Sequence, residues 1–87
     1  MGNTNAITKR IESTVLSVHH RNGGTLAKLD FNLRLLDAAL LLDSLDLAEI
    51  IVSIEREFHY SPFEAPQPPR TWSELVAQVE ALRKEGG

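Results

Sequence analysis

The sequence predicts an all-α protein, a small bundle of three or four helices with one long ordered loop after the first helix. Apolar residues recur at helical spacing in three segments, and clusters of glycine or proline separate these segments. A length of 87 residues fits one small domain. We therefore expect a single domain over residues 1–87, with helices at about 4–20, 44–59 and 72–84.

The first expected helix carries an apolar stripe at three- and four-residue steps, formed by Ile7, Ile11, Val15 and Val18. Thr4 or Asn5 is the expected N-cap, because short polar side chains favour that position. Two consecutive glycines, Gly23 and Gly24, end the helix.

The segment 21–43 is too apolar for a solvated linker, yet its apolar residues hold no single period: Leu26, Leu29, Phe31, Leu33, Leu35 and Leu36. Alternation over part of it is typical of a strand, but we identify no second strand to pair with it. We expect a long ordered loop that covers the core, with a short helical turn near Asp37.

The second helix has the clearest period, with a buried face of Leu47, Ile50, Ile51, Ile54 and Phe58. Ser44 is a residue type that favours the N-cap, and Asp46 is favourable in the first turn. The helix is expected to end near His59 or Tyr60, because Pro62 disfavours a helical conformation at the preceding residue.

All four prolines fall in 61–70, which we expect to be an irregular connection. Thr71 and Glu74 then form an expected capping box, with Thr71 as the cap and Glu74 reaching back. The last helix carries the apolar residues Trp72, Leu75, Val76, Val79 and Leu82.

The net charge of −3 is uneven, since residues 1–42 carry +2 and residues 43–58 carry −4. A nucleic-acid-binding surface requires a basic stripe, which the sequence lacks, whereas an acidic patch suits a basic protein partner.

No segment is long and apolar enough to span a membrane, and residues 1–10 lack the apolar stretch of a signal peptide. We expect a soluble, monomeric protein of the cytoplasm.

The absence of cysteine excludes disulfides, thiolate metal sites and cysteine nucleophiles. His19 and His20 are adjacent, and neighbours on a helix point about 100° apart, so they are poorly placed to bind one metal. We interpret both as surface or boundary residues and expect no metal site.

The outward face of the second helix combines apolar and charged residues: Leu45, Ala48, Glu49, Val52 and Arg56. An apolar strip flanked by acids is typical of a docking surface. Single exposed apolar residues are also common, so a neutral surface is the alternative interpretation.

Ser44 permits three interpretations. No Gly-x-Ser-x-Gly motif surrounds it and no His-and-carboxylate pair is evident, so a hydrolytic nucleophile is disfavoured. A plain N-cap needs no further explanation. As an attachment point, Ser44 would place a phosphate ester against free backbone N–H groups and the positive end of the helix dipole.

The start of this helix resembles the acyl carrier protein signature, with an attachment triplet, two acids and an acid-rich end before phenylalanine: Asp43-Ser44-Leu45, then Asp46 and Glu49, then Glu55-Arg56-Glu57-Phe58. The resemblance covers roughly residues 4–84 and is most specific between Leu41 and Phe58. It implies a bundle of the acyl carrier type and a non-catalytic carrier that serves other enzymes.

The resemblance implies that Ser44 carries 4′-phosphopantetheine, placed there from coenzyme A by a phosphopantetheinyl transferase. The thiol of this arm would hold acyl groups as thioesters for acyl-loading and acyl-transferring enzymes, and the bundle would shelter the chain between helices. Asp43 and Asp46 would help the transferase and its magnesium dock. Partner recognition is implied for Leu45, Ala48, Glu49 and Val52, which match the family's recognition helix.

Departures from the family pattern favour a specialised stand-alone carrier. Prolines replace the acidic short third helix, which we expect to be shortened, displaced or lost. The lead Leu40-Leu41-Leu42 and Trp72 resemble carriers such as the D-alanyl carrier, and Arg56 replaces a usual acid. The expected pathway is fatty-acid synthesis or specialised lipid, cell-envelope or secondary-metabolite acylation. The alternatives are an aminoacyl carrier and an unmodified helical adaptor.

Overall fold

The computed structural model describes residues 3–62 and 66–86, without the side chains of 3–5 and 82–86. Its helices are α1 (Asn3–Arg21), the short 3-10 helix η1 (Ala38–Leu40), α2 (Ser44–Phe58) and α3 (Trp72–Gly86). The described residues include no strand, so the predicted all-α class is confirmed. The helix bounds differ from the expected ones by no more than two residues.

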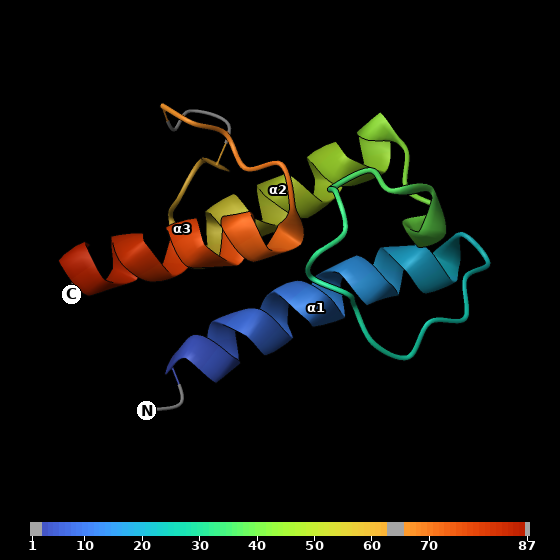
Figure 1. Cartoon of the computed structure of the whole chain (residues 1–87), viewed down its shortest axis with the longest axis horizontal. Helices are drawn as coiled ribbons and strands as arrows, with labels where there is room; N and C mark the ends of the chain where they lie inside the picture. Colours follow the sequence, from blue (N-terminus) through green and yellow to red (C-terminus); the bar gives the residue numbers. More distant parts are fainter. Residues whose placement is uncertain (1–2, 63–65, 87) are drawn as a thin grey trace.

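The three long helices lie side by side, with α1 running in one direction and α2 and α3 in the other (Figure 1). The two ends of the chain therefore lie at the same end of the bundle (Figure 1). The long loop, η1 and the start of α2 gather at the opposite end, beside the C-terminal end of α1. This end of the bundle positions Ser44.

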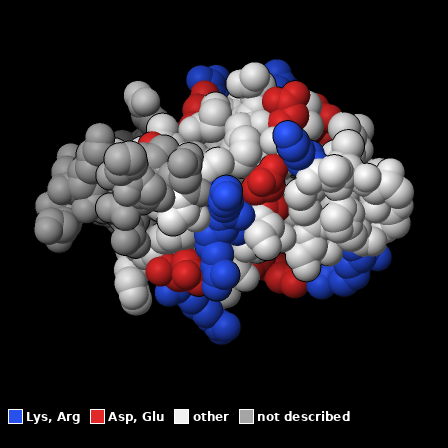
Figure 2. All heavy atoms as spheres, turned by 90° about the horizontal axis from the view of Figure 1, so that it is seen from below, with Lys and Arg blue, Asp and Glu red and all other residues white. Residues whose placement is uncertain are grey.

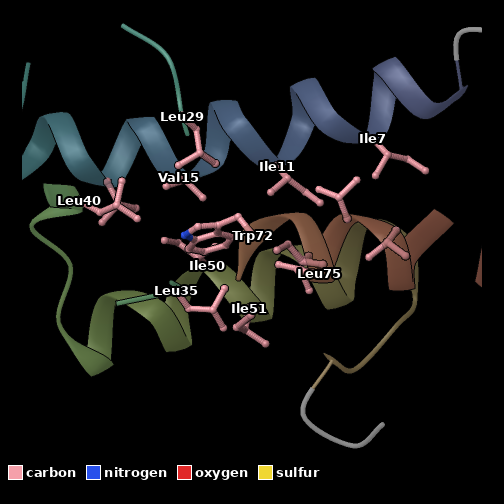
Figure 3. Packing of buried hydrophobic residues seen from close by; sticks show 14 residues of the cluster. Ile7, Ile11, Val15, Leu29, Leu35, Leu40, Ile50, Ile51, Trp72 and Leu75 are labelled. Carbon is pink, nitrogen blue, oxygen red and sulfur yellow. The ribbon is translucent and has the colours of Figure 1, made fainter. Parts of the chain in front are cut away.

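One hydrophobic core joins the helices and the loop. Trp72 of α3 is fully buried and lies at its centre, close to Val15, Leu40 and Ile50 (Figure 3). The buried cluster consists of Ile7, Ile11, Val15, Val18, Leu29, Leu35, Leu40, Ile50, Ile51, Ile54, Trp72, Leu75, Val76 and Val79. The predicted stripe of α1 is thus confirmed, whereas Leu47 and Phe58 of the α2 stripe are only partly buried.

The alternating segment of the loop pairs with the start of α3. Arg34 and Thr71 form an isolated antiparallel bridge, and the Leu35 N–H donates to the Arg70 carbonyl at 3.2 Å. The N–H groups of Trp72 and Ser73, which lack acceptors inside their own helix, donate to loop carbonyls at 3.3 and 2.8 Å. The loop therefore caps α3 as well as covering the core.

The expected turn near Asp37 is confirmed. The Asp37 carboxylate accepts from the Ala39 N–H at 2.9 Å and caps η1. Leu40 of η1 is fully buried, so this single turn anchors the loop in the core immediately before α2.

The other helix starts agree in part with the sequence. The Thr71 hydroxyl accepts from the Glu74 N–H at 3.2 Å, as expected of an N-cap. The Glu74 carboxylate accepts from the N–H of Arg70, one residue before the expected position, at 2.8 Å. Thr4 and Asn5, expected as caps, lie inside α1, which already includes Asn3.

The interpretation of His19 as a surface or boundary residue is wrong, because the loop covers the end of α1 and buries the ring. Only 2% of His19 is exposed, and its Nδ1 lies 2.8 Å from the Leu40 carbonyl oxygen. The Leu26 N–H donates to Nε2 at 3.1 Å. A carbonyl only accepts and an N–H only donates, so the ring is neutral with its proton on Nδ1. His20 is exposed, and its Nε2 contacts the Leu26 carbonyl oxygen at 2.6 Å.

Gly24 makes this close packing of the loop possible. A Cβ atom at this position would collide with the His19 ring, which leaves room for glycine alone. The turn at Gly23 and Gly24 can therefore lie directly against the buried His19 ring only because residue 24 has no side chain.

Residues 63–65 of the proline-rich connection lie outside the described residues, and the expectation for the family's short third helix falls partly on them. In the part of the chain that is described, no helix has the length and hydropathy needed to cross a bilayer.

We expect His19→Phe to lower the free energy of unfolding by about 1–3 kcal/mol, because it leaves the Leu26 N–H and the Leu40 carbonyl without partners. Urea unfolding measures the change. His20→Phe is the matched control, since the exposed His20 ring makes one hydrogen bond and its replacement should cost less. Equal losses in both variants would contradict a stabilising role for the buried ring.

Candidate functional site

Ser44 is the first residue of α2, but it does not cap the helix, so the expected capping role is wrong. Asp43 is the N-cap: its carboxylate accepts from the Asp46 N–H at 2.8 Å. The Asp46 carboxylate reaches back and accepts from the Asp43 N–H at 3.2 Å. Each aspartate carboxylate accepts from the backbone N–H of the other, and the three-residue spacing between them is that of a capping box.

This arrangement leaves the Ser44 side chain free. Ser44 is exposed, and its hydroxyl forms no hydrogen bond with any described residue. The N–H groups of Ser44 and Leu45 belong to the first turn, which lacks acceptors within the helix. The positive end of the helix dipole also lies here. A phosphate ester on Ser44 would find donors and a favourable field without displacing any contact.

Large apolar side chains stay exposed on both sides of Ser44. Leu45 is 78% exposed, Leu41 is 48% exposed and Val52 is 44% exposed. Ala48, which lies between Leu45 and Val52 on α2, is exposed as well. Exposed apolar residues that share one side of a helix are typical of a binding surface, although single ones are also common. The apolar strip that the sequence predicted on the outer face of α2 is therefore present, and Leu41 extends it.

Leu41 adopts a left-handed backbone conformation with a φ of 58°. A residue with a Cβ pays roughly 1–2 kcal/mol for that conformation, so it needs support from its surroundings. The Asn22 side-chain amide supplies it by donating to the Leu41 carbonyl at 2.8 Å. The same amide donates to the Asp46 carboxylate at 2.8 Å, which connects the end of α1 to both sides of Ser44.

Arg21 forms the second connection between α1 and α2. Its guanidinium contacts both carboxylate oxygens of Glu49, at 2.9 and 3.1 Å, and one oxygen of Asp46 at 3.3 Å. The hydrogen bond from Arg21 holds the pKa of Glu49 below its usual range. The Asp43 N–H and the Asn22 amide lower the pKa of Asp46 in the same way. Both carboxylates are therefore ionised at neutral pH.

The charges do not form one acidic surface on the side of the bundle shown in Figure 2, where acidic and basic side chains are interspersed. Three acids of α2 meet arginines of α1: Asp46 and Glu49 meet Arg21, and Glu57 meets Arg10. The acidic run that the sequence places in 43–58 is thus partly neutralised by the neighbouring helix.

The predicted recognition residues fall into two groups. Leu45, Ala48, Glu49 and Val52 are exposed along one side of α2. The Asp46 side chain is only 17% exposed and is occupied by hydrogen bonds from its neighbours. Asp43 is exposed, but its carboxylate already caps the helix. The two aspartates shape the site, and the other four residues form its accessible surface.

Three residues of this site were not predicted from the sequence: Arg21, Asn22 and Leu41. The sequence shows Arg21 and Asn22 only as the polar end of a helix before two glycines. A basic residue beside an amide at a helix end is a weak signal, because their partners lie 19 to 28 residues away and depend on how the helices pack.

A cavity of about 290 Å³ lies between α1 and α2, lined by Arg10, Ile11, Thr14, Ser53, Ile54, Arg56, Glu57 and Phe58. It lies toward the far end of α2, since Ser53 is roughly 14 Å along the helix axis from Ser44. The described residues contain no group of three or more side chains that could hold a metal ion.

No protein-family model, curated protein or solved structure matches the chain.

The capping contacts predict different costs for two neighbouring substitutions. We expect Asp43→Ala to lower the free energy of unfolding by about 1 kcal/mol, the usual contribution of an N-cap. Ser44→Ala should change it by less than about 0.5 kcal/mol, as is usual for exposed positions without contacts. Denaturant unfolding compares them, and Asp43→Ser, which keeps a capping oxygen, serves as the control. A larger cost for Ser44→Ala than for Asp43→Ala would contradict this assignment of the cap.

Proposed function

We propose that this protein is a carrier that holds acyl groups as thioesters on a 4′-phosphopantetheine arm attached to Ser44. The observation that carries the proposal is the free, exposed hydroxyl of Ser44 at the start of α2, where Asp43 has taken over the capping role. A serine whose hydroxyl bonds no described residue is available for modification, and the resemblance of Asp43-Ser44-Leu45 to the carrier signature indicates which modification it carries.

The proposed attachment is a phosphoryl transfer from coenzyme A. The Ser44 oxygen forms a bond to the phosphorus next to the pantetheine, and the bond from that phosphorus to the adenosine bisphosphate breaks. The transferase accepts the hydroxyl proton and supplies magnesium. In the carrier, the phosphodiester would lie beside the first-turn N–H groups of α2, which favour an anion.

The apolar strip of Leu41, Leu45, Ala48 and Val52 supplies the proposed docking surface for the transferase and the acyl-handling enzymes. Leu45 directly follows Ser44, and Ala48 and Val52 continue along the same side of α2, so an enzyme that contacts them would hold the arm at its own active site. Apolar side chains that a partner covers provide most of the binding energy in such interfaces, and charged neighbours provide orientation.

The proposal covers acyl and aminoacyl cargo alike, because the thiol belongs to the arm and the chain itself has no cysteine. A specialised lipid, cell-envelope or secondary-metabolite pathway, or fatty-acid synthesis, would use such a carrier. Loading from coenzyme A places the proposed carrier in the cytoplasm. An unmodified helical adaptor is the alternative, and it requires the exposed strip but not the Ser44 hydroxyl.

The first test is the intact mass of the protein after incubation with coenzyme A, magnesium and a broad-specificity phosphopantetheinyl transferase. We expect the mass to increase by one phosphopantetheinyl group, and we expect Ser44→Ala to show no increase. Ser53→Ala is the matched control, because it removes another exposed serine from the same helix and should be loaded normally.

The mass of the protein from its own host completes this test, since a dedicated transferase would act there. If the protein is unmodified in both experiments, the carrier proposal is wrong and the unmodified helical adaptor is favoured.

A second prediction concerns the strip. Leu45→Ser should lower kcat/KM for loading about tenfold, in the range of interface residues that a partner buries. It should leave the midpoint of urea unfolding unchanged, because Leu45 is 78% exposed in the free protein. Steady-state loading kinetics and urea unfolding provide the two values. Unchanged kinetics would remove Leu45 from the docking surface.

A further inference from the structure

The Arg21–Glu49 pair differs from the other exposed ion pair between α1 and α2. Arg21 makes a two-pronged contact, with Nη1 at 3.1 Å from one oxygen of Glu49 and Nη2 at 2.9 Å from the other. Arg10 meets Glu57 through one nitrogen only, at 3.1 Å. A planar guanidinium that meets both oxygens of a carboxylate recognises it with defined direction and strength.

Glu49 is the one acid of this site that can exchange its partner. The Asp43 carboxylate caps α2, and the Asp46 carboxylate accepts from the Asp43 N–H, from Asn22 and from Arg21. Removing either aspartate from these contacts would disturb the start of the helix. The Glu49 oxygens contact Arg21 alone among the described residues, and the Glu49 side chain is 53% exposed.

Arg21 can also leave at little cost. Its side chain is 54% exposed, and it makes no hydrogen bond to the loop or to the core of the described protein. Exposed ion pairs contribute little to stability because water solvates both charges well when they part. Displacing Arg21 from Glu49 would therefore leave the fold of the bundle in place.

We infer that Arg21 occupies, within the free protein, the position on Glu49 that an arginine of a docking enzyme takes, and that this exchange selects among partners. The inference rests on the proposed function and names the chemistry of the partner. The partner presents an arginine next to an apolar groove, so that its guanidinium replaces that of Arg21 while the groove covers Leu45 and Val52.

This exchange would select against proteins that are merely basic. Lysine-rich surfaces would meet an acid that is already paired, and a lysine ammonium lacks the fork that matches both carboxylate oxygens. A partner that supplies only charge would gain little by displacing Arg21. A partner that supplies the apolar contact as well would gain the energy of covering the strip.

The test compares Arg21→Gln with Arg10→Gln, which removes the same charge from the same helix and leaves the site untouched. The probe is a broad-specificity phosphopantetheinyl transferase whose docking face carries an arginine, and the readout is KM and kcat for loading at low and at physiological salt. We expect Arg21→Gln to lower KM about two- to fivefold relative to Arg10→Gln, the range that exposed ion pairs contribute. We expect kcat to stay unchanged and the salt dependence of KM to become steeper.

Arg21→Lys adds a graded control, since it keeps the charge and loses the fork. Its KM should fall between those of the original protein and Arg21→Gln. A carboxyl NMR titration should also show the pKa of Glu49 returning toward its usual range in Arg21→Gln, because the hydrogen bond that lowers it is gone.

Two outcomes would overturn the inference while leaving the carrier proposal intact. Equal KM values for Arg21→Gln and Arg10→Gln would mean that only the overall charge matters. A higher KM for Arg21→Gln would mean that Arg21 itself contacts the enzyme. A protein that gains no phosphopantetheinyl group in any form would instead remove the proposed function, and this inference with it.

Discussion

The buried ring of His19 joins three parts of the chain that the rest of the structure depends on. One ring nitrogen contacts η1 through the Leu40 carbonyl, and the other accepts from the loop at Leu26. A ring that is 98% covered can hold both contacts only as a neutral imidazole in one tautomer. The ring therefore holds the loop and η1 against α1, and η1 lies shortly before the start of α2.

The same end of α1 then shapes the surface around Ser44. Asn22 supports the left-handed backbone at Leu41 and binds Asp46, while Arg21 binds Glu49. Asp46 is thereby oriented to complete the box with Asp43, and this box makes a capping role for Ser44 unnecessary. At one end of the bundle the fold brings together a Ser44 hydroxyl that bonds no described residue, the exposed apolar strip and a Glu49 carboxylate paired with Arg21.

A domain of this size has a thin stability margin. Exposed leucines add nothing to that margin and lower the solubility of the protein, so packing of the bundle does not account for them. The strain at Leu41 reduces that margin further. The strain at Leu41 and the exposed apolar side chains close to it support the proposal that this surface binds a partner. In the proposed carrier, this surface is what the partner enzymes would share, whatever group the arm carries.

The sequence by itself determined the all-α class, the buried stripe of α1, that of α3 from Trp72 to Val79 and the outer face of α2, because helical periodicity and the turn chemistry of glycine and proline are local properties. The side chain of Leu82, the last residue of the predicted α3 stripe, lies outside the described residues. The sequence also indicated the turn at Asp37. Only the tertiary structure decided that His19 is buried, that Asp43 replaces Ser44 as the cap and that Arg21 and Asn22 belong to the site. The physical reason is distance along the chain. These roles depend on partners that folding brings from another helix or loop, and a local sequence pattern does not indicate which distant residues will become neighbours.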